Sequence, residues 1–171
     1  GACGGARHRD RLAGRMQTES VIDIAAPWER VFALAADVER WPERLPHYRW
    51  VRVLGRDDPR TAVEMAARRG RIPVRWRAVQ EVRPAERRIL FTHTAGPTRG
   101  MRVEWSFTPT AGGVRVRIRH DLRWPPPLHW VARWVVGRFF IAHVAGRTLR
   151  RVKALAELTE APGQPAGEGQ G

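Results

Sequence analysis

The sequence has few of the residues that would indicate disulfides, membrane spans or a lysine-rich surface. Cys3 is the only cysteine among 171 residues, so no disulfide framework forms within the chain. Lys153 is the only lysine. No apolar stretch reaches the roughly 18 uninterrupted residues that a spanning helix needs, because arginine and histidine interrupt the segment 130–146. These absences lead us to expect a cytoplasmic protein without a transmembrane segment.

The composition predicts one folded domain between two disordered ends. A chain with 43% hydrophobic residues and this length can bury a sizeable core. Residues 1–15 are rich in Gly, Ala and Arg without periodicity, and residues 160–171 are a Gly, Pro, Gln and Glu run. We therefore expect disordered tails at 1–15 and 160–171 around a domain at 16–159.

The formal net charge of +14 raises the question of nucleic-acid binding, because clustered cations gain affinity by displacing counterions from phosphates. The arginines, however, are spread over every predicted element. On strand-like segments they alternate with apolar residues, as Arg115, Arg117 and Arg119 do. That pattern is typical of the solvated face of a half-buried sheet. The sequence thus disfavours nucleic acid as a partner, and its basic surface also suits an acidic protein.

Periodicity and turn signals predict the order of elements. Residues 17–25 alternate as a strand, Pro27 precedes a short helix at 28–36, and 37–46 should form a second short helical turn and a loop. A long helix is predicted at 128–158. Between them, Gly and Pro turns separate six strand-like runs at about 48–56, 60–69, 72–83, 87–95, 99–109 and 113–124.

This order predicts an α+β helix-grip fold. Short reversals make neighbouring strands antiparallel, and a seven-stranded curved sheet needs its concave face covered. Only the last helix is long enough to do so, with the two short helices following the first strand. The sheet would then wrap around the C-terminal helix and enclose an apolar cavity for a hydrophobic small molecule.

Alternation also predicts which side chains face that cavity. The inward sets contain aromatic and aliphatic residues with a few polar interruptions. They are Val74, Trp76, Ala78 and Gln80; Met101, Val103, Trp105 and Phe107; Val114, Val116, Ile118 and His120; and, on the helix, Trp134, Ile141, Ala145, Leu149, Val152 and Ala156.

Four polar residues among these positions have both a functional and a structural interpretation. Arg138 lies within the apolar stripe of the last helix, where its charge needs an anion, a polar ligand group or a route to solvent. His120 either exchanges a proton near neutral pH or is a hydrogen-bonded core histidine. Gln80 either orients a carbonyl or fills a polar gap. Tyr48 either places its hydroxyl at the cavity mouth or packs at a strand start.

The sequence contains no pattern typical of a metal site or a bound cofactor. His129 and His143 are fourteen residues apart without a matching acid, which is not a metal-ligand spacing. Glycine motifs for dinucleotides or phosphates and the G-x-S-x-G hydrolase motif do not occur. We expect neither a metal nor a cofactor.

Three segments resemble a known family. Residues 20–32 (SVIDIAAPWERVF), 37–48 (DVERWPERLPHY) and 149–157 (LRRVKALAE) are similar to the polyketide cyclase/dehydrase branch of the START-like (SRPBCC) superfamily. The similarity is greatest to actinobacterial aromatase/cyclases. It implies binding of a poly-β-ketone carried on an acidic acyl carrier protein, followed by ring closure and dehydration.

The resemblance also implies roles for particular residues. Trp41 and Tyr48 would stand at the pocket entrance, and Trp76, Met101 and Trp105 are further matching positions. If the protein is such a cyclase, we expect Tyr48, His120 and Arg138 to be catalytic by shuttling protons or stabilising an enolate. Gln80, or Glu81 if the register shifts by one, replaces the pocket arginine of those cyclases, and Arg138 is a candidate to compensate for the missing charge. The implied substrate-binding residues are Trp41, Trp76, Gln80, Met101, Trp105, Phe107 and Trp134. The alternative function is a noncatalytic carrier of a lipid or quinone.

Overall fold

The computed structural model describes residues 14–69, 71–124 and 141–158. Their order matches the prediction: one strand, short helices, six strands and a final helix. The elements are β1 (Gly14–Ile24), α1 (Trp28–Ala36), η1 (Val38–Arg40), α2 (Trp41–Arg44), β2 (Tyr48–Asp57), β3 (Arg60–Arg69), β4 (Ile72–Arg83), η2 (Pro84–Glu86), β5 (Arg88–Ala95), β6 (Arg102–Thr110), β7 (Gly113–Trp124) and α4 (Ala142–Leu158).

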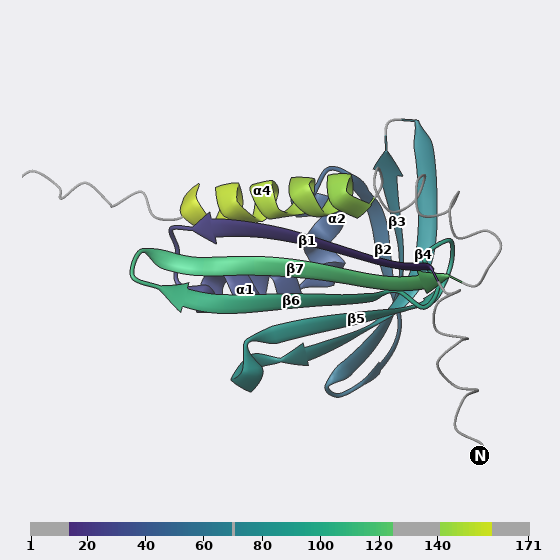
Figure 1. Ribbon diagram of the computed structural model, residues 1–171, viewed down its shortest axis with the longest axis horizontal. Helices are drawn as coiled ribbons and strands as arrows, with labels where there is room; N and C mark the ends of the chain where they lie inside the picture. The colour runs from purple at the N-terminus through teal and green to yellow at the C-terminus, as the bar shows by residue number, and fades with distance from the viewer. Residues whose placement is uncertain (1–13, 70, 125–140, 159–171) are drawn as a thin grey trace, which may run out of the picture.

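The strands form one seven-stranded antiparallel sheet in the order β1-β7-β6-β5-β4-β3-β2. The first strand pairs with the last, from Gly14 opposite Trp124 to Ile24 opposite Val114. Figure 1 shows β2, β3 and β4 rising steeply across the direction of β1, β7 and β6, so the sheet is strongly curved. This confirms the predicted α+β helix-grip architecture.

Three strand starts differ from the prediction. β1 begins at Gly14 instead of Gln17, and β5 begins at Arg88 instead of about 87. β6 begins at Arg102 instead of about 99, because the preceding residues turn back on β5: the Gly100 N–H donates to the His93 carbonyl at 2.9 Å and the Met101 N–H to Thr98 at 2.9 Å. The predicted helix segment 128–140 and the tail segments 1–13 and 159–171 lie outside the described residues.

The last helix is fastened to the end of β1. Its buried face consists of Ala145, Thr148, Leu149, Val152 and Ala156, which confirms the apolar stripe predicted for this part of the helix. Two polar contacts fix its C-terminal half: Lys153 Nζ donates to the Asp23 carbonyl at 2.7 Å, and Glu157 Oε1 accepts from the Ala25 N–H at 3.0 Å. In Figure 1, α4 runs along β1.

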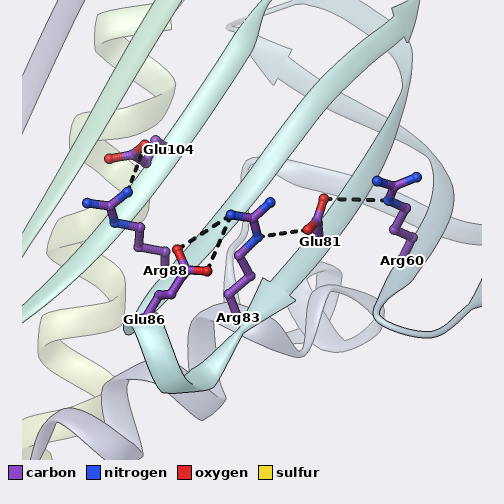
Figure 2. Close-up of polar contacts among 6 residues, drawn as sticks. All are labelled: Arg60, Glu81, Arg83, Glu86, Arg88 and Glu104. Carbon is purple, nitrogen blue, oxygen red and sulfur yellow. Dashed lines mark hydrogen bonds and ion pairs between the residues drawn. The ribbon is translucent and has the colours of Figure 1, made fainter.

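The outward face of the sheet carries acids that neutralise its arginines. Because side chains alternate along a strand, charged residues of neighbouring strands meet on this face. Glu81 accepts from Arg83 Nε at 2.7 Å and lies 3.5 Å from Arg60 Nε. Figure 2 shows this row of alternating charges, formed by Arg60, Glu81, Arg83, Glu86, Arg88 and Glu104.

Candidate functional site: an aromatic cavity under the last helix

A cavity of about 70 Å³ lies between the concave face of the sheet and α4. Its wall combines residues from α2, from six strands and from α4. They are Trp41, Tyr48, Met65, Trp76, Phe91, His93, Thr98, Met101, Val103, Trp105, Ile118, His120, Ile141, Val144, Ala145 and Thr148.

Trp41 packs at the centre of the aromatic wall. The step Trp41-Pro42 begins α2, where proline is tolerated because the first helical N–H groups have no intrahelical partner. This short helix brings the indole inward, with its ring 5.0 Å from Tyr48, 5.8 Å from Phe91 and 6.0 Å from Trp105. Aromatic pairs at these separations attract one another beyond their burial. Trp41 therefore both supports the wall and limits the free volume.

The cavity is hollow but small. A buried water needs about 10–15 Å³ of such volume, whereas pockets for drug-sized ligands span roughly 300–1,000 Å³. At about 70 Å³ the space holds only a few waters. A larger guest must displace wall side chains.

Two polar groups of the wall lack a hydrogen-bond partner. The indole Nε1–H groups of Trp41 and Trp76 are buried and unpaired within the described part of the chain. Trp76 is otherwise well fixed, since its ring stacks on His93 at 5.9 Å with an interplanar angle of 6°. A buried unpaired donor costs about 1–3 kcal/mol. Both indoles can therefore gain from an acceptor oxygen on a guest.

Tyr48, Thr148 and His47 form a hydrogen-bonded chain from the cavity outward. His47 Nε2 lies 2.8 Å from Thr148 Oγ1, and Thr148 also hydrogen-bonds with the Tyr48 hydroxyl. Burial raises the pKa of Tyr48, and the Thr148 contact lowers it in part. Burial, followed by the charges of Arg147 and His143, lowers the pKa of His47 to about 4. At neutral pH the phenol keeps its proton and the imidazole is uncharged.

Two further histidines of the wall are paired with threonines. His93 Nδ1 lies 2.6 Å from Thr98 Oγ1, and His120 Nδ1 lies 3.3 Å from Thr18 Oγ1. Burial and the nearby His120 lower the pKa of His93 to about 3, and burial lowers that of His120 to about 4. His120 is thus neutral at pH 7, which favours its structural interpretation over proton exchange near neutrality.

The structure brings most of the predicted site residues together. The cavity wall contains Tyr48, His120, Trp41, Trp76, Met101 and Trp105. Arg138 and Trp134 lie outside the described residues.

Gln80 and Phe107 are buried but do not line the cavity. Gln80 Nε2 donates to the Ala36 carbonyl at 2.9 Å, because the last carbonyls of α1 have no intrahelical donor. Phe107 packs edge-on against Phe32 of α1 at 5.1 Å. Both residues therefore hold α1 on the sheet. The pairing of β4 also settles the register, since Gln80 points inward while Glu81 belongs to the outer ion pairs.

Sequence reasoning missed several wall residues. His93 follows Ile89 and Phe91 at the spacing of an inward strand face, so the alternation of β5 could have identified it. Thr148 lies three residues after Ala145 on the buried face of α4, but its polarity hid it from an apolar pattern. No local signal links His47 to Thr148, because that contact joins residues 101 positions apart.

The described wall residues include histidines but no carboxylate, lysine or arginine. Residues 14–69, 71–124 and 141–158 contain no group of His, Cys, Asp and Glu side chains that could hold a metal ion. No helix in the described ranges is both long and apolar enough to cross a membrane. The chemistry available in the described wall is hydrogen bonding and aromatic contact.

A curved antiparallel sheet closed by a C-terminal helix over an aromatic cavity is a helix-grip fold. Residues 24–151 match the model of the family described as polyketide cyclase/dehydrase and lipid transport, and the chain belongs to this family.

Relatives in Streptomyces bear names of the same kind. The chain is 32% identical over 107 residues to the granaticin polyketide synthase bifunctional cyclase/dehydratase of Streptomyces violaceoruber, which covers 61% of this chain and 33% of that protein. It is 30% identical over 113 residues to a Streptomyces cyaneus protein assigned as a polyketide cyclase, covering 64% and 74% of the two chains. The chain thus spans about a third of the granaticin enzyme.

Solved structures share the fold. The ZhuI aromatase/cyclase from Streptomyces sp. R1128 superposes with a TM-score of 0.77 at 20% identity, covering 87% of this chain and 98% of that one. The di-domain aromatase/cyclase StfQ of the steffimycin pathway gives 0.77 at 22% identity, covering 91% and 56%.

Proposed function

We propose that this protein is a polyketide cyclase or aromatase that folds a carrier-bound poly-β-ketone in its cavity and promotes aldol ring closure and dehydration. One domain at about residues 16–159 would carry out this reaction in the cytoplasm. An acidic acyl carrier protein would deliver the substrate to the basic surface. Family membership and the names of the relatives support this class of reaction.

The unpaired indole donors of Trp41 and Trp76 carry the proposal. A β-ketone chain presents a carbonyl oxygen on every second carbon, and each oxygen accepts a hydrogen bond. Two such oxygens would pair the two buried N–H groups, which have no partner in the described part of the chain. A purely hydrocarbon guest would leave them unpaired. The wall therefore favours a guest that is apolar and rich in carbonyls.

In the proposed reaction, Tyr48 donates a hydrogen bond to the ketone under attack. Thr148 donates to the Tyr48 oxygen and accepts from the His47 Nε2–H, which leaves the phenol proton free for the guest. The new carbon–carbon bond joins an enol carbon to the polarised carbonyl carbon. The enol proton passes to the carbonyl oxygen, which becomes a hydroxyl. This hydroxyl later leaves as water together with a hydrogen from the neighbouring carbon, and a carbon–carbon double bond forms between the two carbons. The aromatic walls supply proximity by restricting the chain.

Arg138 and Trp134 remain proposals that rest on sequence alone. In this proposal Arg138 stabilises the enolate, because Gln80 does not line the cavity, and Trp134 contacts the substrate. His120 helps to shape the wall.

Turnover of a carrier-bound β-ketone chain tests the proposed function. We expect Tyr48→Phe to lower the rate of cyclised product by about 100-fold, the lower range for loss of a positioned proton donor. Arg138→Ala should also lower it, while Arg102→Ala, an exposed arginine without an ion pair among the described residues, serves as the charge control. Undiminished turnover in both Tyr48→Phe and Arg138→Ala would overturn the catalytic roles proposed for these two residues.

The second candidate is a noncatalytic carrier of a lipid or quinone. The absence of charged side chains from the described wall favours it, because an apolar cavity with a few hydrogen-bond donors suffices for binding. Native mass spectrometry of protein purified from its source should then reveal a co-purified apolar ligand. Repeatedly empty spectra together with cyclase turnover would exclude the carrier.

A further inference from the structure

Three side chains form a hydrogen-bonded path from the cavity to the surface. Tyr48 and Thr148 line the cavity, whereas His47 lines a surface hollow between the end of β3 and α4. His47 Nε2 lies 2.8 Å from Thr148 Oγ1, and Thr148 hydrogen-bonds with the Tyr48 hydroxyl. Each of the three residues is at most 8% exposed. The path therefore crosses the buried layer between the cavity and the hollow.

The outer end of this path reaches solvent. Among the described residues, His47 Nδ1 has no hydrogen-bond partner, and the buried side-chain nitrogens without a partner there belong to Trp41 and Trp76. Nδ1 is therefore open to water in the hollow. Burial, followed by the charges of Arg147 and His143, keeps the pKa of His47 low and its imidazole uncharged at neutral pH. An uncharged imidazole can release a proton from one nitrogen while the other nitrogen accepts one.

The inner end of the path needs a supply of protons. In the proposed function, Tyr48 donates a hydrogen bond to the oxygen that becomes a hydroxyl and later leaves as water. A hydroxyl leaves more easily when a positioned acid gives it a proton, and Tyr48 is already bonded to it in this scheme. Burial raises the pKa of Tyr48, so a phenolate left behind in the wall would be unfavourable. The phenol can give up its proton only if another proton reaches its oxygen in the same step.

We infer that Thr148 and His47 relay protons from the hollow to Tyr48 while the guest loses water. The inference rests on the proposed function, in which Tyr48 contacts the oxygen that leaves. Thr148 and His47 act through Tyr48 and do not need to touch that oxygen. The other two histidines of the wall are paired with different threonines. The geometry thus singles out His47 as the histidine that connects Tyr48 to solvent.

Atoms and charges balance in the relay step. The C–O bond of the guest breaks as the Tyr48 proton joins the leaving hydroxyl, and the electrons of the neighbouring C–H bond form the double bond. The Thr148 proton replaces that of Tyr48, and the His47 Nε2 proton replaces that of Thr148. His47 Nδ1 takes a proton from water in the hollow, and the proton released by the guest carbon neutralises the hydroxide left there. The guest loses one water, and the protein keeps its number of protons.

Hydrogen exchange at the Tyr48 hydroxyl tests the relay without a substrate. Tyr48 is the only tyrosine of the chain, so protein labelled with ¹³C at the tyrosine Cζ gives one NMR signal, which differs slightly between the O–H and O–D forms. In a mixture of water and heavy water, the wild type should exchange fast and show one averaged signal. His47→Gln keeps an N–H donor for Thr148 but cannot pass a proton on, and Thr148→Val removes the hydroxyl. Both variants should exchange at least tenfold more slowly.

Two further variants control this measurement, which is made at a temperature where thermal melts show every variant folded. Thr148→Ser keeps the hydroxyl and should restore fast exchange, and Thr94→Val changes an exposed threonine of β5 outside the path. Wild-type exchange in His47→Gln would overturn the relay, because a merely structural contact survives that substitution. Slow exchange in the wild-type chain would also overturn it, since the path would then carry no protons.

Turnover of a carrier-bound β-ketone chain separates this inference from the proposed function. His47→Gln and Thr148→Val should still close the ring but release at least tenfold less dehydrated product, so that the cyclised alcohol accumulates. If both variants dehydrate as fast as the wild type, the relay fails while the proposed function stands. If the wild-type chain forms no cyclised product, the proposed function fails, and the exchange measurement still decides whether the path carries protons.

Discussion

His47 and Thr148 join the cavity wall to a basic hollow on the surface: the imidazole Nε2 lies 2.8 Å from the threonine Oγ1. The contact links the loop before β2 to the middle of α4, 101 positions away. On its inner side Thr148 interacts with the Tyr48 hydroxyl, and on its outer side His47 lines a hollow together with Arg68, Arg147, Arg150 and Arg151.

Thr148→Val should remove this link with almost no change in shape. We expect the free energy of unfolding in urea to fall by about 1–3 kcal/mol, because the buried His47 loses its partner. Thr148→Ser keeps the hydroxyl and is the control. Equal stability of the valine and wild-type chains would show that the contact contributes nothing.

Stability should fall as the pH drops below about 6.5. The pKa values of His47, His93 and His120 are about 4, 3 and 4, below the ordinary 6.5, so the unfolded chain binds more protons between pH 6.5 and 4. In this range each histidine lowers the free energy of unfolding by up to about 1.4 kcal/mol for every pH unit of acidification. Denaturant unfolding measured from pH 7.5 to 4.5 checks this.

The acid sensitivity should be traceable to the wall histidines. His93→Asn keeps a polar atom near the Thr98 hydroxyl but cannot titrate, so its pH profile should be shallower. The pKa values of Asp23 and Asp121 are also lowered, so protonation of these carboxylates weakens the fold only below about pH 4. They do not account for a loss of stability at pH 5. Identical profiles for His93→Asn and the wild type would contradict this account.

Gln80→Met should destabilise the fold without weakening the binding of a guest in the cavity. The half-buried Ala36 carbonyl would lose its donor, at a cost of about 1 kcal/mol in the free energy of unfolding. Gln17→Met, on an exposed position of β1, is the control. Binding of an aromatic ketone should remain near the wild-type value, since Gln80 does not line the cavity. A selective loss of binding would show that the amide contacts the guest.

Gly96→Ala should be more harmful than Gly100→Ala. Both glycines have positive φ, 96° and 88°, so both replacements strain the backbone. At Gly96 the new Cβ would also lie 2.7 Å from the Arg75 carbonyl oxygen and 2.9 Å from Trp76 Cα, whereas at Gly100 nothing lies within 4 Å. We expect an additional loss of about 2 kcal/mol at Gly96 by thermal or urea unfolding. Equal losses would show that β5 can move away from β4.

The sheet could be predicted from sequence because its signals are local. Alternation placed Trp76, Met101 and Trp105 on the inward face, and Gly and Pro marked the reversals. Roles that depend on distant partners could not be predicted in this way. Gln80 has the inward register expected of a cavity residue, but it faces the end of α1, and only the packing of α1 on the sheet reveals this.

The size of the cavity also lay beyond the sequence. Alternation along β6 shows that Trp105 points inward but not that its ring lies 6.0 Å from that of Trp41. Volume depends on how side chains from separate elements interlock, which no single segment encodes.

The proton–nitrogen NMR signals of the tryptophan indoles test the central claim most directly. A planar aromatic ketone would be titrated into ¹⁵N-labelled protein, with the Trp41 and Trp76 Nε1–H signals assigned from Trp41→Phe and Trp76→Phe. We predict that these two signals move downfield as their unpaired N–H groups acquire acceptor oxygens, while that of Trp28 stays in place. If the ketone binds and both signals remain where they were, the cavity does not recognise carbonyl oxygens and the account is wrong.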